Sequence, residues 1–445
     1  MTKNILISDA NHGGLTLLEE YSKHTSNNLF FYDTYNKLSK EEKDNISEKF
    51  NVTFLSRENI LSDEDKYIKI NPIHMPPHFS TDYTHHEFTA YLLNKIKKQH
   101  DTHFKLIQIT GVKGKTTVCS IATELLSDYN TLSLTSNSLK YNNQTLLKNL
   151  SITPASAIVA LNKAIQENII EEVDFCIFEV SLGIIPNGEI GVLTNILENY
   201  PIASSTSSAS IAKESVFKSE NIICDYDAFN NYYDKEHDII TLSLDNKNAT
   251  IYASNIKYDI ENTTFTVNFQ NNKFIVNHFA LTDFYINNML FAISIALISG
   301  LDTETIKDKL KNTSSIKGRG SYKYINNKLI IEDINPGLNT TSIKKCVNNL
   351  KKFNTKYTLI IGGDYGITCE EINEDKLLEY INTIKNEDIV FAGELGINLN
   401  KKFNKKFKEF TNINEAIEYC IKNENHILQI IYRSEYHRSL DEIIN

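Results

Sequence analysis

The sequence predicts an α/β protein built on parallel sheets. Apolar, strand-like runs alternate with helix-like segments, and this alternation is typical of parallel strands joined by helical crossovers. Several runs are apolar throughout, as strands covered on both faces are. One run passes through a glycine turn directly into a helix, an arrangement that binds phosphate groups. We therefore expect Rossmann-like N-terminal and C-terminal domains on either side of a central P-loop domain.

Residues 1–101 are expected to form the N-terminal, substrate-binding domain. A strand at 4–7, a Gly-Gly turn, a helical stretch and a second apolar run at 28–32 make a Rossmann-type beginning. Thr84 precedes Glu87 by three residues, which is the spacing of a capping box, so a helix should begin there. That helix leads to the glycine turn, and its end sets the domain boundary.

Residues 102–312 are expected to form the P-loop domain and residues 313–445 a third α/β unit. The apolar run at 174–180 indicates a buried parallel strand. Short alternating runs between about 238 and 280 predict an antiparallel appendage. The helix at 286–299 is apolar on nearly every face, which predicts that it is buried. Strands of the third unit are expected at 329–331, 358–361 and 388–391.

The composition is that of an ordinary globular protein. Of 445 residues, 41% are hydrophobic and 23% are charged. Because no apolar run approaches the ~20 residues of a membrane span, and the first residues resemble a strand and loop, we expect no membrane anchor or signal peptide. The net charge of −10 argues against general nucleic-acid binding. The six cysteines are widely spaced without a C-x-x-C motif, so a reducing cytoplasm is expected.

The glycine turn after the strand ending at Thr110 is the most informative motif. Free N–H groups of such a turn can cradle phosphates, Lys115 can reach the β- and γ-phosphates, and Thr116 can offer its hydroxyl to Mg²⁺. Ile109 stands where the longer P-loop pattern has its first glycine. The alternative is a turn that only joins a strand to a helix. The expected phosphate-binding residues are Gly111, Lys113, Gly114, Lys115, Thr116 and Thr117.

Polar residues end several of the predicted strands. Glu179 ends the buried strand and suits Mg²⁺, directly or through water, although it could also cap the next helix. Thr194 and Asn195 end the next strand and could orient water or substrate, or simply form a turn. Asp333 ends a strand of the third unit and faces the same way.

Three further residues lie in local sequences that are typical of purely structural or surface positions, and two of them also suit a functional role. Arg319 lies between two glycines and suits the charge of a transferring phosphoryl group, but could be a solvated hinge residue. Asn288 could contact an adenine edge, although the sequence alone favours a helix N-cap. Lys213, by itself, indicates a surface helix lysine.

Eight of the twelve histidines precede the glycine turn. Such clustering favours a metal site, yet the spacing matches no regular zinc pattern. These imidazoles could instead contact substrate carboxylates, or lie on the surface and at helix caps. They are His12, His24, His74, His78, His85, His86, His100 and His103.

These motifs, in this order, resemble the Mur ligase superfamily from about residue 104 to 400. The resemblance implies a three-domain ligase that uses ATP and Mg²⁺, with Thr116 and Glu179 at the metal. It implies that Lys213 is the carbamylated lysine of many members, and that Asn288, Arg319 and Asp333 belong to the nucleotide site. The sequence departs from the family at Leu182, which replaces a serine, at Asn199-Tyr200, where an Asp-His is usual, and at Phe284-Tyr285, in place of a His-Asn pair.

A narrower resemblance is to the coenzyme F-430 synthetase branch of that superfamily. It rests on the segments 9–14, 72–77, 84–87, 181–183 and 198–203. It implies a nickel seco-tetrapyrrole acid as substrate, a propionate activated as an acyl phosphate, and ring closure through a carbon–carbon bond.

The ring-forming carbon must lose a proton, so a general base is expected. His74, His85 and His86 are the candidates, and the catalytic set becomes Lys115, Arg319, Lys213, His85 and His86. Because the substrate carries many carboxylates, its pocket should be locally basic or rich in N–H donors. We expect it between the first domain and the P-loop face. The alternatives are a cell-wall-type peptide ligase with the same nucleotide residues, and an ATP-dependent metallocofactor chaperone that makes no product.

Overall fold

The computed structural model describes residues 3–233, 237–259, 263–270, 272–278, 282–311, 313, 319–353, 355–366, 372–384, 387–404, 406–422 and 425–434. The chain divides into two compact units. Unit 1 comprises Met1–Ala253, Val267–Phe274 and Asn287–Lys309, and unit 2 comprises Ser254–Thr266, Ile275–Ile286 and Leu310–Asn445. The boundary expected near residue 312 lies close to the start of the last segment. The one near residue 101 falls inside unit 1 and stays a prediction.

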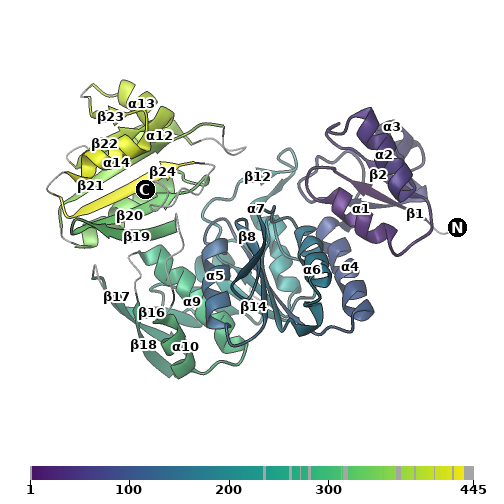
Figure 1. Ribbon diagram of the computed structural model, residues 1–445, viewed down its shortest axis with the longest axis horizontal. Helices are drawn as coiled ribbons and strands as arrows, with labels where there is room; N and C mark the ends of the chain where they lie inside the picture. Colours follow the sequence, from purple (N-terminus) through teal and green to yellow (C-terminus); the bar gives the residue numbers. More distant parts are fainter. Residues whose placement is uncertain are drawn as a thin grey trace. The chain divides into compact units, whose positions relative to one another are not determined.

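The N-terminal sheet is parallel throughout, with strand order β3-β2-β1-β4-β5 among the described residues. Figure 1 shows its strands β1 and β2 in purple, together with helices α1, α2 and α3. The chain runs from β1 outward to β3 and then returns to β4 on the other side of β1. The order therefore reverses between β1 and β4, and ligands bind at such a switch point in open α/β sheets. The elements are β1 (Asn4–Ser8), α1 (Gly14–Ser22), β2 (Leu29–Tyr32), α2 (Lys40–Phe50), β3 (Val52–Phe54), α3 (Arg57–Ser62), β4 (Tyr67–Asn71) and β5 (Tyr83–Thr84).

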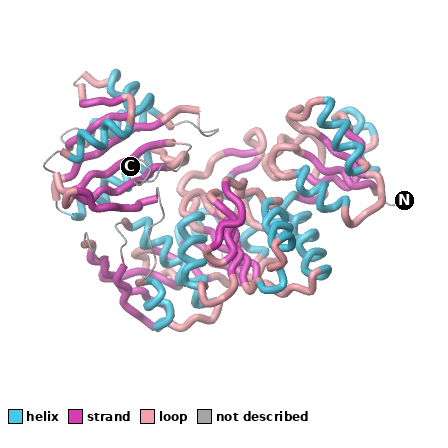
Figure 2. The backbone as a smooth tube through the Cα atoms, in the orientation of Figure 1, coloured by secondary structure: helices cyan, strands magenta, loops and turns pink. Residues whose placement is uncertain are grey.

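The P-loop sheet has the order β18-β17-β16-β15-β14-β11-β6-β10-β7-β8-β9 over the described strands. Figure 2 shows strands in magenta and the helices around them in cyan. Its centre, from β14 to β7, is parallel, and the hairpin of β8 and β9 continues it antiparallel. Its first elements are α4 (His85–Gln99), β6 (Lys105–Thr110), α5 (Lys115–Leu125), β7 (Thr131–Leu134), β8 (Ser138–Tyr141), β9 (Gln144–Lys148), α6 (Ser156–Gln166), β10 (Phe175–Glu179) and β11 (Ile190–Leu193). The later ones are β12 (Pro201–Ile202), β13 (Ser207–Ser208), α7 (Ala209–Lys213), β14 (Asn221–Asp225), α8 (Tyr226–Tyr232), β15 (Ile240–Ser243), β16 (Ile251–Lys257), β17 (Thr263–Phe269), β18 (Asn272–His278), α9 (Asp283–Ile298) and α10 (Thr303–Leu310).

The expected antiparallel appendage is wrong at its start. β15 pairs in parallel with β14, and β16 pairs in parallel with β15. The short helix α8 supplies the crossover that a parallel partner of β14 requires, and its pattern did not stand out among the Asn-rich turns. The buried helix is confirmed, because Met289, Leu290 and Phe291 of α9 are all 0% exposed.

The sheet of unit 2 has the order β19-β20-β24-β21-β22-β23 among the described strands, and only β19 runs antiparallel to its neighbour. The three predicted strands correspond to β20, β21 and β22. The fully buried central strand β24 was not predicted, because it follows charged, helix-like sequence near the end of the chain. The elements are β19 (Arg319–Ile325), β20 (Lys328–Ile334), α11 (Thr340–Leu350), β21 (Tyr357–Gly363), α12 (Glu374–Thr383), β22 (Asp388–Ala392), α13 (Gly393–Lys401), β23 (Lys408–Phe410), α14 (Ile413–Ile421) and β24 (Ile427–Arg433).

One hydrophobic core runs through the two sheets of unit 1. Leu17 of α1, Leu93 of α4 and Leu161 of α6 belong to the same buried cluster. A polar contact crosses this core, because the Asn162 side chain donates to the buried Glu20 carboxylate at 2.8 Å. The N-terminal sheet is thus packed on the P-loop sheet, and side chains from both can line one site.

The five cysteines within the described residues are free, and Cys369 lies outside that part of the chain. Burial raises the pKa of Cys176 and Cys224 well above the usual value of a thiol. No helix in the described residues is long and apolar enough to cross a membrane.

The predicted capping box at the start of α4 is present and can be tested. The Thr84 hydroxyl accepts from the Glu87 N–H at 3.2 Å, and the Glu87 carboxylate accepts from the Thr84 N–H at 3.0 Å. We expect Thr84→Ala to lower the free energy of unfolding by about 1 kcal/mol, since the hydroxyl acceptor is lost. Urea denaturation measures the change. Thr84→Ser keeps the acceptor and should stay near wild type; an equal loss in both variants would contradict the role of the cap.

Candidate functional site

The glycine turn has a shape that only glycine permits at two positions. Gly111 and Gly114 have φ values of +141° and +88°. A Cβ atom on Gly111 would come within 2.0 Å of Thr194 Oγ1, and one on Gly114 within 2.3 Å of Asn288 Oδ1. Both glycines are therefore required by backbone conformation and by space. Gly114 caps α5, whose first N–H groups are the ones a phosphate would meet.

Thr194 and Asn195 hold this turn from the end of β11. The Thr194 hydroxyl donates to the Lys113 carbonyl at 2.6 Å, and the Asn195 amide donates to the same oxygen at 3.0 Å. The Asn195 side-chain oxygen accepts from the Lys113 N–H at 3.1 Å. These side chains are thus engaged with the loop backbone, which makes them positioning residues for the P-loop.

Glu179, Thr116 and Lys115 meet at the end of β10. The buried Glu179 carboxylate accepts from the Thr116 hydroxyl at 2.9 Å and from the Ser136 N–H at 3.2 Å. Lys115 Nζ lies 4.0 Å from the other carboxylate oxygen and donates to the Gly111 carbonyl at 3.1 Å. A carboxylate touching a hydroxyl beside a phosphate cradle is the hard-oxygen donor set that Mg²⁺ takes. The residues therefore fit the implied ion. Ser136 is the member of this group that the sequence analysis missed.

Lys213 is not the surface lysine that its sequence context indicates. It ends α7 and is 1% exposed, while Ile211, on the same short helix, is 60% exposed. Burial, and secondarily the charge of Lys115, lowers the pKa of Lys213 to about 7. A five-residue helix gives too short a periodicity to reveal its buried face, which explains the error. An amine that is partly neutral near pH 7 can react with CO₂.

Asn288 is not a helix N-cap. α9 begins at Asp283, so Asn288 lies more than one turn inside the helix, and its side-chain oxygen lies against Gly114. In unit 2, Arg319 opens β19 and is the register partner of Asp333. The Asp333 carboxylate accepts from Gln429 Nε2 at 3.0 Å. Thr117 is buried at the start of α5.

A pocket of about 750 Å³ lies within unit 1, between the segment that follows β4 and the residues around α7. Its charged lining consists of Glu87, Glu214 and Lys218. The charged lining of this pocket is therefore not basic, and the expectation of a substrate pocket that is locally basic or rich in N–H donors stays a prediction. The wall contributed by the N-terminal sheet is mainly apolar and contains Pro72, Ile73, Met75, Pro76, Pro77 and Phe79.

The two adjacent histidines of α4 lie in different environments. His86 lines the pocket, and burial lowers its pKa to about 4. His85 is 1% exposed, its Nε2 lies 3.0 Å from the Ser8 carbonyl, and burial lowers its pKa to about 3. Both rings are neutral at physiological pH, and His86 is the one that a molecule in the pocket can reach.

Comparisons with known proteins find relatives that match most of the chain. Residues 322–435 match the C-terminal domain of coenzyme F430 synthetase CfbE. Over 397 residues the chain is 34% identical to the coenzyme F(430) synthetase of Methanocaldococcus jannaschii, covering 88% of this chain and 91% of that protein.

Two solved structures are similar in fold. MurF from Acinetobacter baumannii has a TM-score of 0.61 at 15% identity, covering 100% of this chain and 93% of that one. MurF ligase from Thermotoga maritima in complex with ADP has a TM-score of 0.61 at 13% identity, covering 100% and 96%. The predicted three-domain α/β fold and its resemblance to Mur ligases are confirmed.

The buried amine of Lys213 predicts a pH dependence of stability. Its pKa is about 7 in the folded chain and has the ordinary value of 10.5 when unfolded, so the unfolded state binds more protons between these values. Stability should therefore rise with pH in this window. In bicarbonate-free buffer, we expect wild type to gain about 2 kcal/mol over Lys213→Met between pH 7 and pH 9. Urea unfolding at each pH measures this. The exposed Lys98→Met variant should follow wild type; parallel curves for wild type and Lys213→Met would contradict the assignment.

Proposed function

Since the chain belongs to the coenzyme F430 synthetase family, we propose that it is the ligase that closes the last carbocycle of a nickel tetrapyrrole. ATP transfers its γ-phosphoryl group to a propionate carboxylate of the nickel seco-tetrapyrrole acid and leaves as ADP. A ring carbon then attacks the acyl carbon, phosphate leaves, and the carbon gives up its proton. The new carbon–carbon bond closes a six-membered ring to give coenzyme F-430. Activation is necessary because a free carboxylate has no adequate leaving group.

The observation that carries this proposal is the position of Lys213 between the P-loop and the pocket. The charge of Lys115 contributes to the lowered pKa of Lys213, and the charge of Lys213 contributes to the lowered pKa of His86 at the pocket wall. Its neighbours Ala212 and Glu214 line the pocket. A carboxylate that extends from the pocket toward Lys213 would therefore approach the phosphates that Lys115 holds, which is the proximity that phosphoryl transfer needs.

The first half of the reaction has a clear set of residues. Lys115 would neutralise charge on the transferring group, and the N–H groups of the first turn of α5 would bind the phosphates. Thr116 and Glu179 would hold Mg²⁺, which offsets phosphate charge when bound. The similar fold of a MurF ligase solved in complex with ADP supports the use of an adenine nucleotide by this chain. The roles of Asn288, Arg319 and Asp333 toward the nucleotide rest on the resemblance to Mur ligases.

We assign to His86 the removal of the proton from the attacking carbon. This ring lines the pocket, is neutral, and has a buried Nε2 without a hydrogen-bond partner in the structure. His85 is better described as a positioning residue, because its Nε2 is engaged with the Ser8 carbonyl and its ring does not line the pocket. We further propose that Lys213 is carbamylated: its neutral amine adds CO₂ and loses a proton, giving a carboxylate beside Lys115.

A product assay tests the proposal. Purified protein, ATP, Mg²⁺ and the nickel seco-tetrapyrrole acid should give stoichiometric ADP, a changed absorption spectrum and a product lighter by one water. ADP release that needs an amino acid, with no change in the tetrapyrrole, would indicate a peptide ligase instead. ATP binding or hydrolysis without product would indicate a metallocofactor chaperone.

Loss of the P-loop ammonium should stop activation. We expect Lys115→Met to lower turnover at least about 100-fold, since a preorganised charge on the transferring group is removed. ADP release measured with saturating ATP and substrate gives the rate. Lys105→Met removes an exposed lysine from the far end of β6, the strand that precedes the glycine turn, and should retain wild-type turnover. Similar rates in Lys115→Met and wild type would contradict the assigned site.

A further inference from the structure

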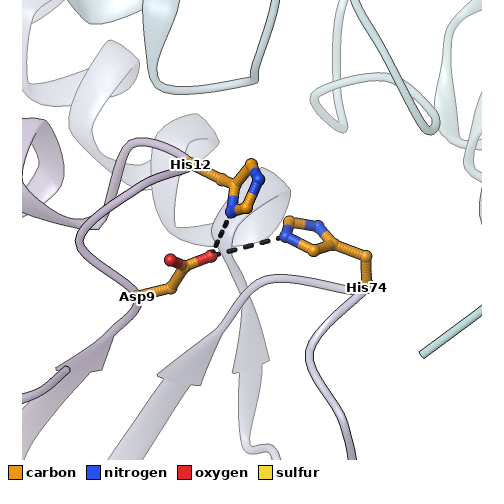
Figure 3. A group of neighbouring side chains, drawn as sticks. All are labelled: Asp9, His12 and His74. Atoms are coloured by element: carbon orange, nitrogen blue, oxygen red, sulfur yellow. Dashed lines mark hydrogen bonds and ion pairs between the residues drawn. The ribbon is translucent and has the colours of Figure 1, made fainter. Parts of the chain in front are cut away.

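A second cluster of reactive side chains lies at the end of the N-terminal sheet (Figure 3). His12 Nδ1 lies 2.6 Å from Asp9 Oδ2, and His74 Nε2 lies 3.4 Å from the same oxygen. The two imidazole rings meet edge to face, with centroids 4.2 Å apart. None of the three residues lines the pocket described above, and none has a role in the proposed reaction.

The Asp9 carboxylate is held in place by the backbone around it. Its Oδ1 accepts from the Asn11 N–H at 2.9 Å, which directs Oδ2 toward the histidines. The Asp9 N–H donates to the Tyr32 carbonyl at 2.9 Å, and the Gly14 N–H donates to the Asp9 carbonyl at 3.1 Å. The carboxylate is thus oriented before any ligand arrives.

The cluster occupies the switch point of its sheet. Asp9 and His12 follow β1, and His74 follows β4, the two strands between which the strand order reverses. The carboxyl ends of such strands form a crevice that binds ligands in open α/β sheets. The cluster is open to solvent on the side of His12, whose side chain is 43% exposed. The side chain of Asp9, at 0% exposed, forms its buried end.

The existing contacts leave one ring nitrogen of the cluster without a hydrogen bond. The Asp9 Oδ2 atom is already taken by the close contact with His12. His74 Nε2 is buried and makes no hydrogen bond in the structure, although it points at this oxygen (Figure 3). A buried polar atom without a hydrogen bond calls for another partner, and a metal ion would supply one to His74 Nε2.

We propose that Asp9, His12 and His74 bind a divalent transition-metal ion. One ligand atom from each residue lies within 4.8 Å of the other two, so a single ion can be shared with small side-chain movements. Two imidazole nitrogens and one carboxylate oxygen suit Zn²⁺, Co²⁺ or Ni²⁺, whereas Mg²⁺ prefers oxygen ligands alone. Three protein ligands leave a coordination position open for water or for a carboxylate of a bound molecule.

Metal analysis of the untagged, full-length chain tests this site without ATP or tetrapyrrole, so its failure and that of the proposed function are distinguishable. Chelator-treated protein is dialysed against Zn²⁺ with excess Mg²⁺, and bound zinc is measured by mass spectrometry. We expect about one zinc per chain in wild type. His12→Gln and His74→Gln should each weaken zinc binding by at least ~10–100-fold, because each removes a metal ligand. Losing a residue that only orients a ligand already costs about that much.

Two controls make the outcome decisive. His103→Gln removes a histidine whose side chain is 88% exposed and should bind zinc as wild type does. Zinc should also raise the melting temperature of wild type and of His103→Gln. It should not raise that of His12→Gln, whose folding is checked by circular dichroism. Equal zinc binding by wild type and His12→Gln, or none by wild type, would overturn the proposal.

Discussion

The site depends on the bonds between the end of β11 and the glycine turn. The side chains of Thr194 and Asn195 both hold the Lys113 carbonyl, which leaves no space for a side chain on Gly111. Asn288 fills the corresponding space beside Gly114. The turn is therefore held in a fixed arrangement, and Lys115, Thr116 and Glu179 are placed around the N–H groups at the start of α5. Electrostatic catalysis needs this preorganisation, because a mobile loop would reorient in each turnover.

Local sequence was enough to predict what local forces determine. The glycine turn, the Thr84 capping box and the buried helix α9 were all recognised, since turn residues and apolar periodicity determine them. The burial of Lys213 was not, because it comes from the packing of distant segments around a single helical turn. The N-cap favoured for Asn288 failed for a related reason: α9 begins earlier than its apolar pattern does.

Long-range pairing also limited the prediction of the sites. The histidine-rich beginning of the chain indicated binding chemistry, but not which rings would meet. Asp9 and His74 are brought together only because β1 and β4 are neighbours in the sheet. The apolar pocket wall likewise depends on long-range packing, because Met75 and Phe79 belong to a buried cluster with Leu6 of β1. An apolar wall would suit the body of the proposed tetrapyrrole substrate, whose carboxylates would then need partners outside that wall.

The buried thiols of the P-loop sheet have a practical consequence. Cys119, Cys176 and Cys224 are each fully enclosed, and burial raises the pKa of all three. A thiol that stays protonated and enclosed reacts slowly with maleimides and with peroxide. A fluorophore can therefore be attached to an engineered surface cysteine on this sheet while these three native cysteines stay in place.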